Sequence, residues 1–158
     1  MQLEQYIHAA LCSYIAGNYP QVIFTTDLNG IRLPISLAKR IKYLKSGRGI
    51  PDLLIFQPAG NKHGLMLEIK SIDADVYRKD GKLKAKAHTQ EQGAMIQRLR
   101  ALGYAAWFVR GIEAGQDCIR TYMTAAKFEK QQLTAATSLD DYTLEWVCER
   151  SVQKTGQK

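Results

Sequence analysis

The chain has 158 residues, a mass of 17.8 kDa, a formal net charge of +7 and a pI of about 9.4. This length suits one domain with a single core, and the positive charge favours a polyanionic partner such as nucleic acid. No apolar run reaches the ~20 residues that a membrane-spanning helix needs. The N-terminus lacks the basic and apolar segments of a signal peptide, so we expect a cytoplasmic protein without a membrane contact.

The first part of the chain predicts a helix, a short strand and a second helix. Apolar residues recur at helical spacing from Leu3 to Ile15, and Gly17-Asn18 supplies a stop. Residues 22–24 are a short apolar run that favours a strand. Residues 36–45 predict a helix with Ser36 as its N-cap. Its inward side chains are expected to be Leu37, Ile41 and Leu44.

Two apolar runs in the middle of the chain, 50–56 and 65–70, carry charged residues at adjacent ends. The loop between them contains proline, asparagine and glycine, which favours a hairpin. Because strand side chains alternate, Glu68 and Lys70 share one face while Ile69 takes the other. A hairpin brings Asp52 beside Glu68. Two buried carboxylates repel, and a divalent cation such as Mg²⁺ or Mn²⁺ with oxygen ligands relieves that repulsion.

The remaining chain predicts an insertion and then alternating elements. Residues 71–88 are too polar for a core element, and Asp80-Gly81 favours an exposed turn. A helix from Thr89 to Leu102 places Gln92 on its apolar stripe and ends at Gly103. Further elements are expected as a strand at 105–109 and helices at 112–123, 125–133 and 142–150. This order predicts an α/β sandwich with a mixed central sheet.

Three sequence blocks resemble the VRR-NUC family of the PD-(D/E)xK nuclease superfamily. Residues 49–53 read G-I-P-D-L, residues 63–70 read H-G-L-M-L-E-I-K, and Glu91-Gln92 is followed by Leu99 and Gly103. The resemblance implies a restriction-endonuclease-like fold and a phage or bacterial source. It covers residues 3–123, so we expect a nuclease core at 1–123, including the insertion, and a C-terminal helical extension of the same domain at 124–158.

The resemblance also implies roles for individual residues. Asp52, Glu68 and the backbone carbonyl of Ile69 would hold Mg²⁺ or Mn²⁺, and Lys70 and Gln92 would complete the catalytic set. For Glu4, two interpretations remain open: a further metal ligand, or a helix-start acid favoured by the macrodipole. Two basic clusters flank the motif and are expected to bind phosphates. They are Lys39, Arg40, Lys42, Lys45 and Arg48, and then Arg78, Lys79, Lys82, Lys84 and Lys86.

The sequence therefore predicts a metal-dependent endonuclease that hydrolyses DNA phosphodiester bonds, with branched or junction DNA as one candidate substrate. Symmetric cutting of two strands needs two active sites, which favours a homodimer. A noncatalytic DNA-binding module on a nuclease scaffold is the alternative. A different phosphoryl-transfer enzyme is disfavoured, because the chain has neither a G-x-x-x-x-G-K-[ST] loop nor a Rossmann glycine signature.

Overall fold

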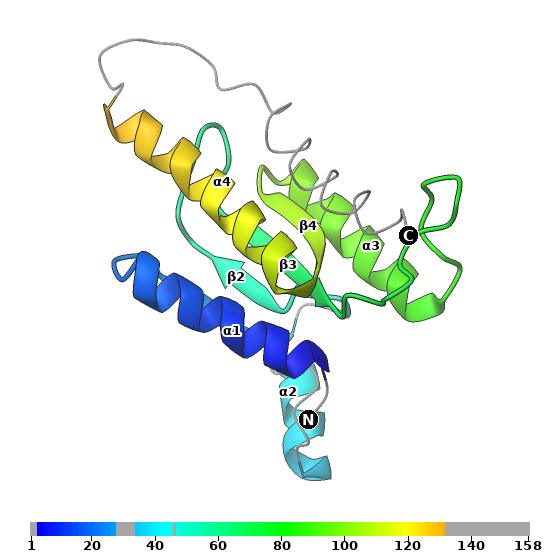
Figure 1. Ribbon diagram of the computed structural model, residues 1–158. Coiled ribbons are helices and arrows are strands. Elements are labelled where there is room, and N and C mark those ends of the chain that lie inside the picture. The colour runs from blue at the N-terminus through cyan, green and yellow to red at the C-terminus, as the bar shows by residue number, and fades with distance from the viewer. Residues whose placement is uncertain (1–2, 28–33, 46, 132–158) are drawn as a thin grey trace.

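The computed structural model describes residues 3–27, 34–45 and 47–131 (Figure 1). Helices and strands alternate in these residues, as the α/β prediction requires. In chain order they are α1 (Leu3–Asn18), β1 (Phe24–Thr26), α2 (Ile35–Leu44), β2 (Leu53–Ile55), β3 (Leu65–Lys70), α3 (Ala87–Ala101), β4 (Ala105–Arg110) and α4 (Gly111–Gln131). No helix in the described part of the chain is long and apolar enough to cross a membrane.

The strands form one mixed sheet in the order β1-β2-β3-β4. The pairs β1–β2 and β2–β3 are antiparallel, whereas β3–β4 is parallel. Parallel neighbours need a long crossover, and residues 71–104, which include the insertion and α3, supply it. The expected α/β fold with a mixed central sheet is thus confirmed.

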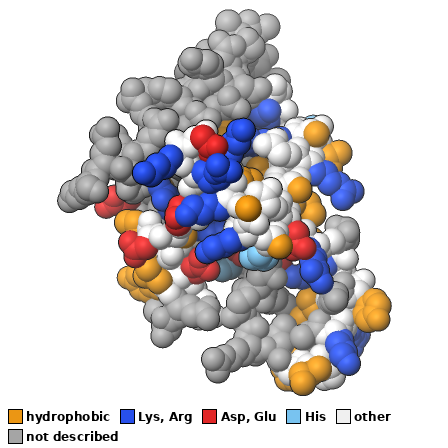
Figure 2. Space-filling model, turned by 90° about the vertical axis from the view of Figure 1, so that its right-hand side faces the viewer, with side chains coloured by type: hydrophobic (Ala, Val, Ile, Leu, Met, Phe, Trp, Pro, Cys, Tyr) orange, Lys and Arg blue, Asp and Glu red, His pale blue; other side chains and the backbone are white. Residues whose placement is uncertain are grey.

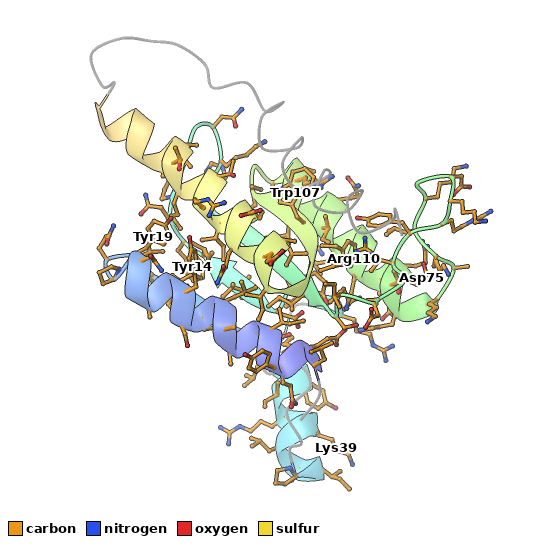
Figure 3. All side chains as sticks on the ribbon, in the orientation of Figure 1. Tyr14, Tyr19, Lys39, Asp75, Trp107 and Arg110 are labelled. Carbon is orange, nitrogen blue, oxygen red and sulfur yellow. The ribbon has the colours of Figure 1, made fainter. Side chains whose placement is uncertain are left out.

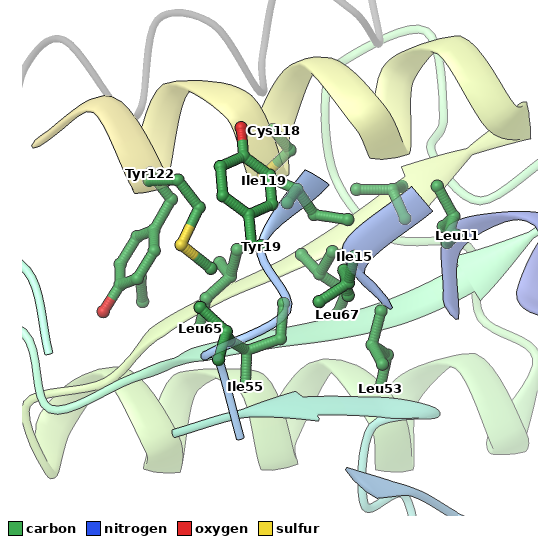
Figure 4. Packing of buried hydrophobic residues seen from close by; sticks show 14 of the residues in the cluster. Leu11, Ile15, Tyr19, Leu53, Ile55, Leu65, Leu67, Cys118, Ile119 and Tyr122 are labelled. Atoms are coloured by element: carbon green, nitrogen blue, oxygen red, sulfur yellow. The ribbon is translucent and has the colours of Figure 1, made fainter. Parts of the chain in front are cut away.

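Helices cover both faces of the sheet (Figure 1). On one face, α1 and α4 pack on the strands, and the main core lies between them (Figure 4). Its fully buried side chains include Leu11, Ile15, Leu53, Leu67 and Ile119. On the other face α3 covers a smaller cluster with Met66, Ile96, Ala106 and Phe108. Alternation along the strands therefore gives each face its own core.

Helix α2 departs from the prediction. Pro34 occupies its N-cap position, and no side chain caps the helix, so the expected Ser36 cap is wrong. Leu37 is 41% exposed and Leu44 is 77% exposed, so these two side chains do not point into a core. The reason is tertiary: α2 projects from the body of the molecule instead of lying on the sheet (Figure 1).

The insertion contributes more to the core than its polar composition predicts. Val76 is buried in the α3-side cluster, with Tyr77 and Leu83 packed against it. Tyr77 and Leu83 form an antiparallel bridge, and the N–H of Gly81 donates to the carbonyl of Arg78, which confirms the turn at Asp80-Gly81. Three apolar side chains thus hold the insertion against the domain.

Helix α4 joins two segments that the sequence separates. The helices expected at 112–123 and 125–133 form one helix that runs to Gln131. At the junction of the two segments, the Thr124 hydroxyl donates to the carbonyl of Arg120 within the same helix. The helix expected at 142–150 lies outside the described residues.

Candidate active site

The β2–β3 hairpin places Asp52 opposite Glu68. Leu53 pairs with Leu67 in the antiparallel register, and Asp52 and Glu68 are the next residues outward on the two strands. Both face the α3 side of the sheet, because Leu53 and Leu67 belong to the core on the opposite side. Asp52 is held further by the N–H of Ile69, which donates to its Oδ2 at 2.9 Å. The hairpin thereby builds the expected pair of carboxylates.

Glu68 is at the centre of the group and is only 1% exposed. Its Oε1 accepts hydrogen bonds from Lys70 Nζ at 2.9 Å and from Gln92 Nε2. Its Oε2 is buried without a hydrogen-bond partner, and so is Oε1 of Gln92. Buried polar atoms rarely lack partners. Two unsatisfied acceptor oxygens on neighbouring side chains therefore indicate a position suited to a positively charged ligand.

The electrostatics agree with that interpretation. Burial raises the pKa of Glu68 to about 8; the negative charge of Asp52 adds to the rise and the ammonium of Lys70 opposes it. Burial also raises the pKa of Asp52, against the opposing effects of the Ile69 N–H and of Lys70. The protein thus holds two carboxyl groups where ionising both is costly, and a cation between them would lower that cost.

Gly49 sets the distance between the hairpin and α3. Its φ is +76°, and a Cβ at this position would lie 2.9 Å from the carbonyl oxygen of Glu91 and 3.0 Å from the backbone N of Gln92. A glycine is therefore required both by conformation and by close backbone contact. This contact brings the start of α3, and with it Gln92, against the segment that leads into Asp52.

Helix α1 contributes two further polar side chains. Glu4 Oε1 accepts a hydrogen bond of 3.3 Å from the N–H of Ser71, directly after Lys70. One helical turn later, His8 has a buried Nε2 atom with no hydrogen-bond partner. A positive charge on His8 lowers the pKa of Asp52. His8 was not predicted from the sequence. Its spacing of four residues from Glu4, which puts both on one helix face, is the signal that could have found it.

Arg110 was also overlooked. It ends β4 in register with Lys70, so the two basic side chains leave the same face of adjacent strands. Its Nη1 donates to the carbonyl of Ala74 at 3.2 Å, which ties the end of β4 to the insertion. Figure 3 shows Arg110 at the side of the sheet where the insertion begins. A lone arginine at the end of a strand gives no local sequence signal that it contacts the insertion.

The oxygen atoms of the site are the kind of ligand that a hard divalent cation prefers, but two carboxylates do not fill its coordination sphere. Asp52 and Glu68 offer carboxylate oxygens, the ligands that Mg²⁺ and Mn²⁺ prefer. Within residues 3–27, 34–45 and 47–131, no group of three or more His, Cys, Asp or Glu side chains is arranged to hold a metal. The role of Glu4 as a further metal ligand therefore stays a prediction, beside its interpretation as a helix-start acid. Such a site suits a cation that keeps several of its waters, as Mg²⁺ does.

Each of the two basic clusters has two side chains that form ion pairs among the described residues. Lys45 forms an ion pair with the buried carboxylate of Asp27, and Arg48 contacts Glu91 at 3.4 Å. In the insertion, Lys84 pairs with Asp75 and Arg78 with Asp80. Exposed side chains are those of Lys39, Arg40, Arg48, Arg78, Lys79, Lys82 and Lys86; the side chain of Lys42 lies outside those described. Figure 2 shows lysines and arginines gathered on the insertion side, with acidic side chains among them.

Comparison with solved structures finds a neighbour that shares this fold. A solved structure described as a VRR_NUC domain protein superposes with a TM-score of 0.52 and 21% sequence identity, over 79% of this chain and 91% of that one. Neither a family model nor a curated protein matches the sequence. The neighbour shares the fold of this chain, and its description agrees with the family that the sequence blocks resemble.

Proposed function

We propose that this protein is a nuclease of the PD-(D/E)xK type that hydrolyses DNA phosphodiester bonds with Mg²⁺ or Mn²⁺. The observation that carries the proposal is the buried pair Asp52 and Glu68 at one end of a hairpin, with Lys70 and Gln92 hydrogen-bonded to Glu68. None of these polar groups is needed to fill a core. Their burial is costly, and a charged ligand together with a phosphodiester offsets that cost.

Asp52, Glu68 and the carbonyl of Ile69 would hold the cation. Bound there, a divalent cation would polarise the scissile phosphate and make a water molecule more acidic. Lys70 would stabilise the negative charge that develops on the phosphate. Gln92 keeps Glu68 in place with one amide atom and has Oε1 free to orient the attacking water. On α1, Glu4 and His8 would support the water structure around Asp52.

When Glu68 is ionised, the ammonium group of Lys70, 2.9 Å from its Oε1, neutralises part of its charge. A cation would take over that task, because both act on the same carboxylate. The ammonium group would then be available to the substrate. This exchange explains why a lysine two residues beyond a carboxylate, on the same face of the strand, serves phosphate chemistry.

The proposal extends to the substrate class and to the assembly of the protein. The described chain contains one such carboxylate pair, so symmetric cleavage of two strands would need two copies. We propose a homodimer acting on branched or junction DNA, as the family resemblance implies. Light scattering coupled to size-exclusion chromatography measures the mass directly, and a monomer on and off DNA would contradict the dimer.

Glu68→Gln and Asp52→Asn test the activity without changing the shape of the side chains. On plasmid and branched DNA with Mn²⁺, each is expected to lower the cleavage rate by about a thousandfold or more, equivalent to several kcal/mol of transition-state stabilisation. Lys70→Ala should lower the rate while leaving Mn²⁺ affinity, measured by calorimetry, nearly unchanged. Glu113→Gln removes an exposed acid in the first turn of α4 and is the matched control.

Two results would contradict the proposal. Wild-type heat of Mn²⁺ binding in both Asp52→Asn and Glu68→Gln would remove the metal assignment. DNA binding by the wild type without cleavage of any plasmid or branched substrate, in Mg²⁺ or Mn²⁺, would favour the alternative, a noncatalytic DNA-binding module.

A further inference from the structure

Helix α2 presents an aromatic ring on the same face as two basic side chains. Tyr43 follows Lys39 by four residues and Arg40 by three, and these spacings put all three on one face of the helix. The ring is 91% exposed, more than any other large hydrophobic side chain in the described residues, and both basic residues are exposed. Figure 3 shows Lys39 extending outward from this helix. A fully exposed ring beside two cations is a surface suited to a base and its phosphates.

The charge around α2 has one sign. Residues 34–48 contain five basic and no acidic side chains. Apolar side chains are exposed on the same helix, at Ile35 and Leu44. Figure 2 shows apolar and basic side chains side by side at the lower end of the molecule, where α2 projects. A polyanion with flat apolar groups matches this combination better than a neutral protein surface does.

Short contacts connect α2 to the carboxylate pair. Lys45, directly after the helix, pairs with Asp27, and the N–H of Asp27 donates to the carbonyl of Asp52 at 2.9 Å. Arg48 and Gly49 then contact the start of α3. The helix is about 15 Å long at 1.5 Å per residue, so a strand lying along it would pass a few nucleotides from Asp52. A contact on α2 would therefore set which phosphate reaches the site.

We propose that α2 selects DNA with unpaired bases, with Lys39 and Arg40 on the backbone and Tyr43 stacked on a base next to the cleavage point. This inference rests on the proposed nuclease function and extends it to the substrate. A blunt duplex keeps its bases stacked on each other and gives the ring no free face. Single strands, flaps and branch points expose such a face.

The test measures binding in a protein that does not cut. In a Glu68→Gln background with Mg²⁺, fluorescence anisotropy compares a single strand, a blunt duplex and a flap of equal length. Tyr43→Ala is expected to weaken binding to the single strand and the flap by about tenfold, and to the blunt duplex by less than about twofold. Tyr43→Phe retains the ring and should bind like its parent. Tyr6→Ala removes another exposed ring, on α1, and is the matched control.

A base analogue supplies a second readout. With 2-aminopurine at the unpaired position, stacking on Tyr43 should quench the fluorescence of the 2-aminopurine. Tyr43→Ala should abolish that quenching. Equal loss on duplex and flap, or no loss on either, would overturn the stacking role. A change in the mass of the DNA-free protein on Tyr43→Ala or Leu44→Ala would assign α2 to a contact between two copies instead. If the parent protein binds none of the three DNAs, the proposed function itself fails.

Discussion

Two basic regions flank the carboxylate pair, and they differ in both charge and attachment. Residues 34–48 carry five basic and no acidic side chains, whereas the insertion at 71–88 carries five basic and three acidic ones, a formal net charge of +2. Each region has two ion pairs: the insertion pairs Lys84 and Arg78 with acids of its own, whereas Lys45 and Arg48 pair with Asp27 and Glu91, which lie outside residues 34–48. Equal numbers of lysines and arginines therefore do not give equal attraction for a phosphate backbone.

The two regions also differ in how they are attached to the rest of the domain. The insertion is fixed by apolar side chains, because Val76 is buried and Leu83 covers Gly93 of α3. The segment after α2 is fixed by main-chain contact, because Gly49 lies against the backbone of Glu91 and Gln92. Side chains can repack, whereas backbone contacts cannot. Residues 34–48, which have the higher net charge, are therefore attached to the site by contacts that tolerate substitution less well than those of the insertion.

The largest difference in stability is expected between alanine substitutions of Gly49, next to α2, and of Gly93, under the insertion. Gly49→Ala adds a Cβ against backbone at a positive φ, and we expect a loss of about 2–4 kcal/mol in the free energy of unfolding. Gly93→Ala places its Cβ 2.2 Å from Leu83 Cδ1, a side-chain atom that can move, so a loss of about 1–2 kcal/mol is expected. Urea unfolding measures both, and equal losses would contradict the distinction between the two attachments.

The carboxylates between the two regions should make stability depend on pH. The pKa of Glu68 rises from 4.5 to about 8 on folding, so the folded state binds more protons than the unfolded state between these values. Stability of the metal-free protein should therefore fall as the pH rises from about 4.5 to about 8, by on the order of a few kcal/mol. Urea unfolding in EDTA at pH 5 and 8.5 measures it. Glu68→Gln, whose amide does not titrate, should show a flatter profile, and parallel profiles would refute the assignment.

Removing two charges from each region tests the electrostatic difference. In the Glu68→Gln background, Lys39→Ala with Arg40→Ala should flatten the slope of log affinity against log salt on duplex DNA by about 1.8, at 0.9 for each phosphate contact. Lys79→Ala with Lys82→Ala removes the same charge from the insertion and should flatten it less. A larger effect for the insertion pair would reverse the comparison and make the insertion the main DNA contact.

The smallest effect is expected at a single paired lysine. Lys84 is matched by Asp75 within the insertion, so Lys84→Ala should change the salt slope by less than about 0.5, and stability by at most about 1 kcal/mol. Lys86→Ala removes an exposed lysine two residues away and is the control. If Lys84→Ala changes the salt slope more than Lys86→Ala does, the Lys84–Asp75 ion pair breaks when the protein binds DNA, and the prediction is wrong.

The sequence predicts the hairpin and its charges because both are local properties. Period-2 alternation places Glu68 and Lys70 together, and turn residues bring Asp52 back beside them. Gln92 was assigned to the site by the family resemblance, and its place on an apolar stripe alone left a solvated helix-start glutamine equally open. The exposure of Leu37 and Leu44 could not be found, because periodicity defines a helix face without saying whether anything packs on it. His8 was missed because its position near Asp52 depends on how α1 packs against the sheet.

The order of strands in the sheet has a consequence for how the chain folds. Asp52 and Glu68 meet through a hairpin of local contacts, whereas Gln92 reaches Glu68 only when α3 docks on the sheet after the longer segment that follows β3. Closing the shorter loop costs less entropy, and local pairing is faster than parallel pairing. We therefore expect the two acids to meet before α3 and its glutamine dock, so that folding passes through a state in which the carboxylates are adjacent, hydrated and still able to ionise freely.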